Sequence, residues 1–135
     1  MIASPLEMSS VTLASHVIKV FGLIHRIAYA FIRPALRIHR ASDNFGAVIS
    51  EPGSPYLNQL LPEVFWEFTS LERELEAVLH GKSPYLAFER VNRRRPDGQI
   101  VYLDLSVTLI ADYELGNGLL LIAEILHAVL VQGRS

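Results

Sequence analysis

Hydrophobic residues recur along the chain with two different periods, and each period predicts a kind of element. From Val11 to Ile24 they recur at steps of three and four residues, which predicts an amphipathic helix with a broad apolar face. Ser4-Pro5-Leu6-Glu7 is a capping box that marks its start. From Ile100 to Ile110 apolar and polar residues alternate, which predicts a strand with one face in the core and one in water.

The remaining pattern predicts a strand pair, a helical middle and a second group of strands. Ile27 to Ile32 and Leu36 to Ala41 are typical of a hairpin around the Arg33-Pro34-Ala35 turn. Short helices are expected at Phe45 to Ile49 and near Pro62, and a longer one from Leu71 to Gly81 after the capping box Thr69-Ser70-Leu71-Glu72. Further strands are predicted at Tyr85 to Val91 and Leu119 to Ile125, with turns at Pro96-Asp97-Gly98 and Gly116-Asn117-Gly118.

Composition narrows the classes of partner. Half of the residues are hydrophobic, 19% are charged and the mean hydropathy is +0.29, so apolar surface is expected at an oligomer interface. A net charge of -2 gives no electrostatic basis for binding nucleic acid or an anionic membrane. With no cysteine, the chain has no disulfide and no thiol-linked chromophore. We predict a cytoplasmic protein, because the first residues lack the basic start and apolar run of a secretory signal.

Three segments resemble the PAS family, in the order in which that family has them. Leu36 to Phe45 is similar to the second PAS strand and the helix after it, where phytochrome-like members carry a Ser-x-Asn like Ser42-Asp43-Asn44. Leu71 to Gly81 resembles the long connecting helix, and Glu89 to Leu105 resembles the hairpin with an Asp-Gly turn. The likeness spans Ile24 to Glu124. The chain departs from the pattern at Arg33-Pro34-Ala35, where most relatives have Asp-Gly.

The resemblance implies an α+β fold with a five-stranded antiparallel sheet, helices on one face and an extra N-terminal helix. Residues 1–23 would form that helix, 24–125 the PAS domain, and 126–135 either an extension of the last strand or the start of a linker helix. The implied function is signal sensing and protein-protein interaction in a regulatory protein, with a regulatory protein partner or a covalently linked output domain. An enzyme or carrier of unrelated fold is an alternative with only the element order in common.

Resemblance and periodicity together place a set of bulky apolar residues in the interior, where the family has its ligand cavity: Phe45, Phe65, Trp66, Leu75, Val78, Phe88, Leu103, Leu105 and Leu121. A cofactor pocket normally mixes apolar residues with placed polar groups. We therefore expect the side chains themselves to fill this space and no cofactor to be present. A sensor that binds a small hydrophobic ligand in the cavity is the alternative.

Polar residues offer no candidate for catalysis or metal binding. Haem-binding PAS domains use a histidine on the long helix, but His80 sits at the end of that helix, where a histidine more often complements the helix dipole. Arg93-Arg94-Arg95 is expected to be a solvated hairpin tip. Glu72, Glu74 and Glu76 are expected on a solvated helix face. We predict that the protein is not an enzyme.

The N-terminal helix is predicted to form a homodimer. Its apolar stripe is wider than one sheet face needs, so half can pack on its own sheet and half on a second copy through a two-fold interface. The residues of the stripe are Val11, Leu13, Ala14, Val17, Ile18, Val20, Phe21 and Ile24.

Overall fold

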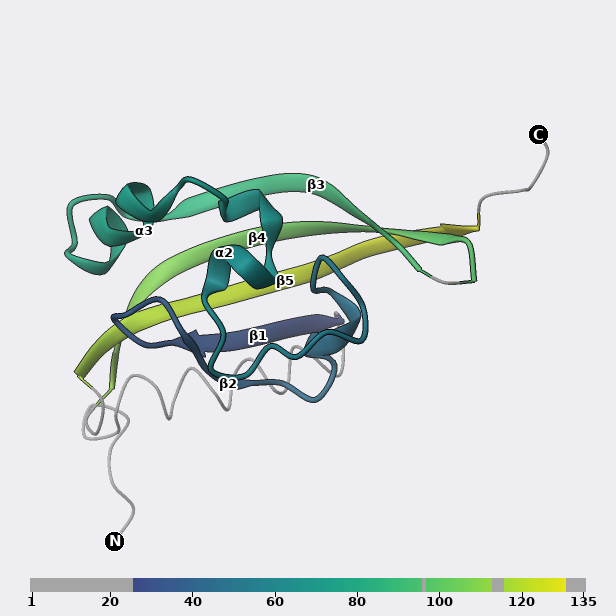
Figure 1. Ribbon diagram of the computed structural model, residues 1–135. Coiled ribbons are helices and arrows are strands. Elements are labelled where there is room, and N and C mark those ends of the chain that lie inside the picture. The colour runs from purple at the N-terminus through teal and green to yellow at the C-terminus, as the bar shows by residue number, and fades with distance from the viewer. Residues whose placement is uncertain (1–25, 96, 113–115, 131–135) are drawn as a thin grey trace, which may run out of the picture.

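The computed structural model describes residues 26–95, 97–112 and 116–130, and in this part the chain forms one antiparallel sheet with helices on one face (Figure 1). The predicted fold class is confirmed. The predicted helix within residues 1–23 lies outside the described residues. The elements in chain order are β1 (Ile27–Ile32), β2 (Ile38–Ala41), η2 (Phe45–Ala47), α2 (Leu61–Val64), η3 (Trp66–Phe68), α3 (Glu72–Leu79), β3 (Leu86–Arg94), β4 (Gln99–Asp112) and β5 (Gly116–Leu130).

The strands lie in the order β2-β1-β5-β4-β3, so the last strand of the chain occupies the centre of the sheet. β5 pairs with β4 from Gly116 to Leu130 and with β1 from Leu119 to Glu124. Its continuous apolar run suits this central position, because a strand paired on both sides needs hydrophobic residues on both faces. The strand also runs past residue 125. Residues 126–130 therefore extend it, which was one of the two predictions for the tail.

The second turn prediction is wrong in detail. Gly116-Asn117-Gly118 is the beginning of β5, paired with Asp112, Ala111 and Ile110 of β4. The connection between the two strands lies at residues 113–115, outside the described residues. The glycine at 118 has a packing reason: a Cβ built there would lie 2.6 Å from the carbonyl oxygen of Ile32.

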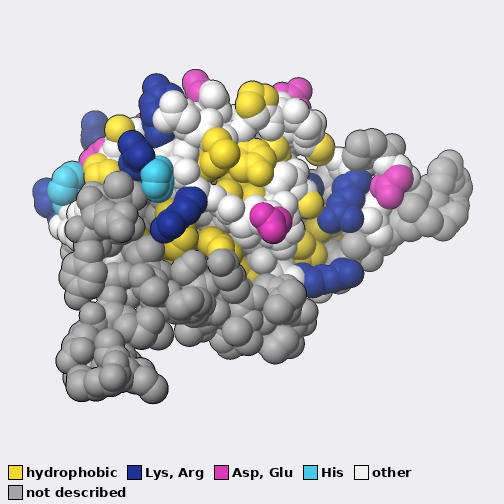
Figure 2. Space-filling model, turned by 90° about the horizontal axis from the view of Figure 1, so that it is seen from below, with side chains coloured by type: hydrophobic (Ala, Val, Ile, Leu, Met, Phe, Trp, Pro, Cys, Tyr) yellow, Lys and Arg dark blue, Asp and Glu magenta, His cyan; other side chains and the backbone are white. Residues whose placement is uncertain are grey.

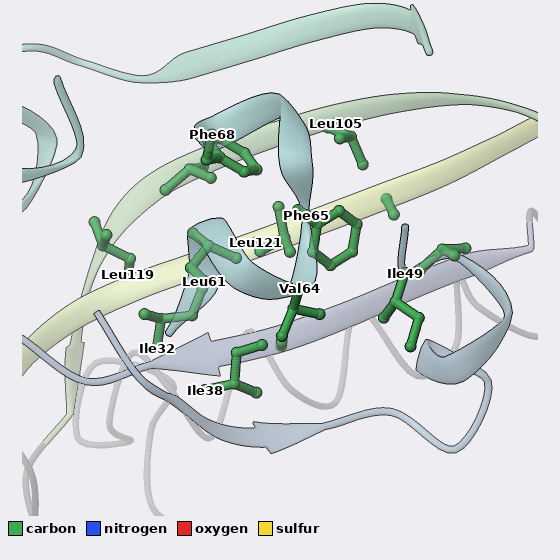
Figure 3. Packing of buried hydrophobic residues seen from close by; sticks show 14 of the residues in the cluster. Ile32, Ile38, Ile49, Leu61, Val64, Phe65, Phe68, Leu105, Leu119 and Leu121 are labelled. Carbon is green, nitrogen blue, oxygen red and sulfur yellow. The ribbon is translucent and has the colours of Figure 1, made fainter. Parts of the chain in front are cut away.

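The main core lies between the sheet and the helices (Figure 3). Alternation along β4 is as predicted over residues 101–107, where every second residue is buried against the helical layer: Val101, Leu103, Leu105 and Val107. Leu109, the next residue of the same series, was expected on this face but is 39% exposed. From the other side of this core, η2, α2, η3 and α3 contribute apolar residues such as Phe45, Leu61, Phe68 and Leu75. Amphipathic helices and an alternating sheet thus bury their apolar faces against each other.

Helix α3 ends as predicted but begins differently. At its C-terminus Gly81 has a φ of 73°, and the N–H groups of Gly81 and Lys82 donate to the carbonyls of Val78 and Ala77, which is a Schellman motif. At the N-terminus the predicted capping box does not form. Leu71 is the N-cap residue and makes no side-chain cap hydrogen bond, while Ser70 has a φ of 66°. The side chain of Thr69 therefore does not cap the helix.

None of the helices in the described part of the chain has the length and hydropathy needed to cross a membrane.

Candidate functional site

The interior between helices and sheet contains most of the residues predicted to line a cavity. Seven of them are at most 1% exposed: Phe45, Phe65, Leu75, Val78, Leu103, Leu105 and Leu121. Phe88 is partly buried and packs against the same cluster. The structure therefore brings these eight residues together, with contributions from η2, the α2–η3 junction, α3 and three strands.

Aromatic rings form a continuous series of contacts through this layer. The ring centroids of Phe45 and Phe65 are 5.4 Å apart, those of Phe65 and Phe68 6.4 Å, and those of Phe68 and Phe88 5.3 Å. Tyr56 adds an edge-to-face contact with Phe45 at 5.1 Å. Such contacts add to the free energy gained from burial alone. The series links η2 to β3 through η3, and Tyr56 and Phe68 are members that sequence reasoning did not include.

Trp66 is the exception among the predicted interior residues. Its side chain is 58% exposed, whereas its neighbour Phe65 is fully buried. The backbone at Phe65 is extended, with φ of -121° and ψ of 102°, and separates α2 from η3. Consecutive residues on opposite sides of such a junction cannot both face the core. The prediction that Trp66 lies in the interior is wrong.

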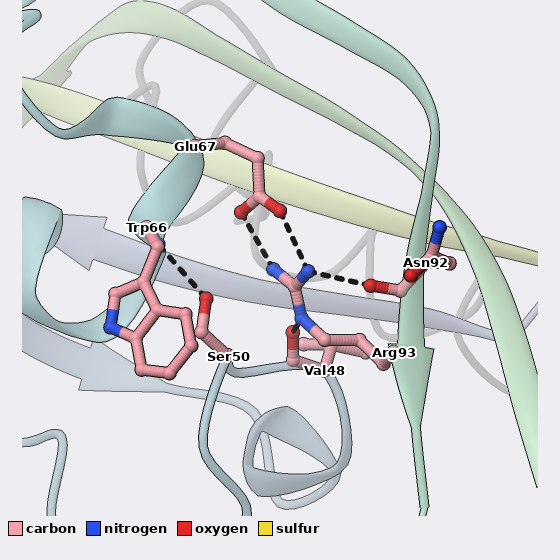
Figure 4. A network of polar contacts seen from close by, with 6 residues as sticks. All are labelled: Val48, Ser50, Trp66, Glu67, Asn92 and Arg93. Carbon is pink, nitrogen blue, oxygen red and sulfur yellow. Dashed lines mark hydrogen bonds and ion pairs between the residues drawn. The ribbon is translucent and has the colours of Figure 1, made fainter.

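Arg93 forms a buried polar site beside this core, where a solvated residue was predicted (Figure 4). Its side chain is only 6% exposed. The guanidinium donates to both carboxylate oxygens of Glu67, at 2.7 and 2.8 Å, and to the carbonyls of Val48 at 2.8 Å and Asn92 at 3.0 Å. It also lies 5.5 Å from the ring centre of Phe65. The predicted solvated tip is wrong for Arg93, because β3 continues to Arg94.

A β-bulge explains why Arg93 faces inward. The register of β3 against β4 shifts between Phe88 and Val91, and Arg90 within the bulge has a φ of 57°. One extra residue in a strand changes which face the following side chains occupy. Asp104 on β4 stabilises the bulge by accepting a hydrogen bond from the backbone N–H of Arg90 at 2.9 Å. The guanidinium of Arg90 lies over the ring of Tyr102 instead of pairing with Asp104.

The ion pair changes the acidity of Glu67. Burial on its own would raise the pKa of this carboxyl, but the hydrogen bonds from Arg93 and its positive charge outweigh burial and lower the pKa below its ordinary value. Glu67 is therefore ionised in the folded protein over the neutral range, and its charge compensates that of Arg93.

Three hydrogen bonds connect the segment after η2 to the same region. Arg93 donates to the carbonyl of Val48, and the N–H of Trp66 donates to Ser50 Oγ (Figure 4). The N–H of Ser50 donates to the carbonyl of Val64. Strand β3 and the helical segments are thus joined by polar contacts at the border of the core. A movement of η3 or of the loop after η2 would have to break charged hydrogen bonds.

The Ser-x-Asn segment joins β1 to the start of the helical region. The N–H of Tyr29 donates to Ser42 Oγ at 2.9 Å, and Ser42 Oγ donates to Asn44 Oδ1 at 2.6 Å. Asn44 Nδ2 in turn donates to the carbonyl of Ile27 at 3.1 Å. Asn44 is the N-cap residue of η2 but makes no side-chain cap hydrogen bond. These side chains therefore hold the chain reversal and do not cap the helix.

The opposite face of the sheet carries a second apolar cluster. Tyr29, Phe31 and Leu120 are 5 to 8% exposed, and three partly buried isoleucines pack against them: Ile27, Ile110 and Ile122. Arg40 lies over Phe31 at 4.9 Å from the ring centre. We call these six apolar residues the outer-face cluster. Strands β1 and β5 therefore present large apolar side chains to both sides of the sheet.

Histidine and carboxylate residues do not form a metal site in the described ranges, where no three of them lie close enough together to hold an ion. His80 is 63% exposed at the end of α3, and its Nδ1 contacts the carbonyl oxygen of Glu76 at 2.9 Å. Its position at the helix terminus is as predicted.

Comparisons with known proteins bear on the fold. No protein-family model matches the chain, and no curated protein matches it significantly. Among solved structures, the chain is similar to the one titled "Crystal structure of sensory box sensor histidine kinase from Vibrio cholerae". The TM-score is 0.50 at 17% identity, and the match covers 90% of this chain and 97% of that one. At this identity the likeness shows the fold alone, which is a PAS-like α+β fold with a five-stranded antiparallel sheet.

Proposed function

We propose that this chain is a PAS-type signal-sensing and protein-protein interaction module that acts as a homodimer, without a covalent cofactor and without catalytic activity. The PAS-like fold and its similarity to a chain titled as a sensory box sensor histidine kinase support the signalling class. The filled aromatic layer supports an interaction module over a ligand sensor, because packed side chains occupy the space where a ligand would lie.

The observation that carries the interaction proposal is the outer-face cluster. An antiparallel sheet with helices on one face usually has a polar opposite face. Here the opposite face carries Tyr29, Phe31 and Leu120 with three isoleucines around them. At about 25 cal/mol per Å² of apolar surface, covering side chains of this size contributes several kcal/mol. The sheet thus has a second buried apolar layer on this side.

The predicted amphipathic helix within residues 1–23 is the partner that the sequence supplies. One half of its stripe, such as Val11 and Phe21, would pack on the outer-face cluster. The other half, such as Val17 and Ile24, would meet the same stripe of a second copy. An interface of this kind is self-complementary, which is what a two-fold dimer requires.

Light scattering of the full chain coupled to size exclusion tests the dimer. We expect a dimer at micromolar concentration, and a folded monomer for Val17→Glu combined with Ile24→Glu. Leu57→Glu is the matched control: Leu57 is 55% exposed in the loop before α2, so this charge should leave the dimer intact. A monomeric parent protein, or a variant pair that stays dimeric with its charges in place, would refute this assembly.

A further inference from the structure

Three arginines lie close together where β1 turns into β2. The backbone N–H of Arg33 donates to the carbonyl of Arg37 at 2.9 Å, so these two residues face each other across the turn. Arg40 follows on β2, where it pairs with Phe31 of β1. All three arginines are exposed, and Figure 2 shows Lys and Arg side chains gathered at this end of the molecule. We call these three arginines the basic patch.

The positive charge of the basic patch is not balanced by carboxylates nearby in the sequence or by ion pairs. From Arg26 to Ser42 the chain has four arginines and no aspartate or glutamate. Within the described ranges none of the patch arginines forms an ion pair, in contrast to the buried Arg93. A positive potential therefore remains at the β1–β2 turn, although the whole chain has a net charge of -2.

Each patch arginine is oriented by one side-chain contact and keeps further donors. Arg33 Nε donates to His39 Nδ1 at 3.0 Å, and Arg37 Nη1 donates to the carbonyl of Asn58 at 2.9 Å. The guanidinium of Arg40 lies 4.9 Å from the centre of an aromatic ring of β1. A guanidinium has five N–H donors, and these contacts use at most one of them in each arginine. Side chains that are oriented in advance lose less entropy when they bind a partner.

The backbone that carries the patch is fixed from the core side. Pro34 restricts φ directly after Arg33. Leu36 has a φ of 65°, yet its side chain is buried, and its N–H donates to the carbonyl of Arg33 at 2.8 Å. The carbonyl of Leu36 accepts a hydrogen bond from the N–H of Leu61 at 2.8 Å. The turn is thus anchored to the helical layer, and the spacing of the arginines is set by the fold.

We propose that the basic patch binds an acidic segment of a partner protein, whose aspartate or glutamate carboxylates pair with the three guanidinium groups. The planar fork of arginine matches a carboxylate with two parallel hydrogen bonds. This inference rests on the proposed function, because it gives the chemistry of a partner for the interaction module. It places that partner on the β1–β2 turn, away from the predicted stripe between Val11 and Ile24.

Charge elsewhere on the chain favours a short acidic segment over a long polyanion. From Glu63 to Glu76 the chain has five glutamates and one arginine, and the net charge is negative. A nucleic acid or an anionic membrane would meet this negative charge as well as the basic patch. A short segment of a partner can contact the three arginines alone.

Fluorescence anisotropy of a labelled peptide of alternating glutamate and serine, titrated with the full chain, tests the patch. We expect saturable binding that weakens with added sodium chloride, because salt screens exposed charges. The same peptide with glutamine in place of glutamate should not bind. Arg33→Gln combined with Arg37→Gln should raise the Kd about five- to twentyfold, since each exposed charge contact contributes up to about fivefold. The double lysine variant keeps the charge without the fork and should fall between the two.

Arg73→Gln combined with Lys82→Gln is the matched control. Both residues are exposed, on α3 and just after it, and their replacement removes the same two positive charges. The Kd of this variant should change much less than that of the patch variant. Equal binding of the two peptides, or an equal Kd for the two folded double variants, would overturn the proposal.

Two further results would assign the patch to another partner and so overturn the proposal. One is tighter binding of phosphatidylserine vesicles than of the glutamate peptide. The other is salt-sensitive growth of the chain beyond a dimer without peptide, which would indicate the glutamates of a second copy as the partner. Light scattering of the same samples reports the dimer separately. A monomeric parent that binds the peptide would refute the dimer and support the basic patch.

Discussion

Glu67→Gln should destabilise the protein strongly, because it removes the only carboxylate that contacts Arg93 among the described residues. In the folded protein Arg93 is 6% exposed and Glu67 20% exposed, so the ion pair is largely shielded from water. Removing one partner of a buried pair costs about 3 to 5 kcal/mol, since it leaves an uncompensated charge. Arg93 would keep its hydrogen bonds to Val48 and Asn92 and its position near Phe65. We therefore expect the free energy of unfolding to fall by about 3 kcal/mol, at the lower end of that range.

Urea unfolding followed by circular dichroism at fixed protein concentration measures this loss. Glu63→Gln is the matched control, because Glu63 is an exposed residue of α2 with no ion pair among the described residues. The control should stay within about 0.5 kcal/mol of the parent. Adding Arg93→Met to Glu67→Gln should recover part of the loss, because the double variant contains no unpaired buried charge. A loss below about 1 kcal/mol for Glu67→Gln would show that Arg93 is hydrated and the reasoning wrong.

The pH dependence of stability has a sign that follows from the lowered pKa of Glu67. The carboxyl binds its proton less readily in the folded chain than in the unfolded chain. Its contribution is thus fully present above the unfolded pKa and is lost as the pH falls through the folded one. The difference in unfolding free energy between the parent and Glu67→Gln should therefore shrink on acidification. A difference that grows as the pH falls would contradict the lowered pKa.

Three further substitutions test particular contacts by the same unfolding assay. Asp104→Ala removes the acceptor at the bulge and should lower the free energy of unfolding by about 1 kcal/mol, whereas Asp104→Asn keeps an oxygen there and should lower it less. Equal losses for the two variants would argue against the hydrogen bond. Gly118→Ala should lower the free energy of unfolding by about 1 to 3 kcal/mol, because its Cβ would meet a carbonyl oxygen of β1, while Gly46→Ala makes ordinary contacts and should be nearly neutral. A larger loss for Gly46→Ala than for Gly118→Ala would refute the packing argument. Phe65→Ala should cost about 3 to 5 kcal/mol and Trp66→Ala much less, and similar losses would mean that the tryptophan is buried after all.

Periodicity in the sequence was sufficient to predict the strands, because their apolar patterns and their core positions have the same physical cause. Ile27–Ile32 has the bounds that the sequence predicts, and residues 101–107 of β4 alternate as expected. The continuous apolar run from Leu119 to Ile125 is typical of a strand buried on both faces, and β5 lies at the centre of the sheet. Its extension to Leu130 had remained one of two alternatives, since residues after 125 show no pattern that favours strand over helix.

The features that sequence reasoning missed depend on single backbone conformations. The bulge at Arg90 turns Arg93 toward the core, and no residue type near Arg90 indicates a bulge in the sequence. The junction at Phe65 sends Trp66 outward for a similar reason. A local clue to the buried ion pair was absent as well, since Glu67 and Arg93 are separated by 26 residues. Such contacts follow from the tertiary fold and not from local propensity.

Resemblance to a family predicted the helix-sheet interior well and the sheet edge poorly. Seven of the nine expected interior residues are fully buried, because the positions that face a helix layer follow from element order. The Arg33-Pro34-Ala35 turn departs from the family pattern, and Leu36, which follows it, has a φ of 65° that the sequence did not indicate. The sequence did not predict the residues of the outer-face cluster. It indicated only that half of the apolar stripe between Val11 and Ile24 could pack on a face of the sheet.

Native mass spectrometry of the purified full chain tests the central claim most directly, because it measures assembly and ligand content together. We expect a homodimer of twice 15.1 kDa with no additional mass after gentle desolvation. A chain that retains a stoichiometric ligand bound in the helix-sheet core would support the small-molecule sensor instead. A bare monomer at micromolar concentration would contradict the claim that this module acts as a homodimer.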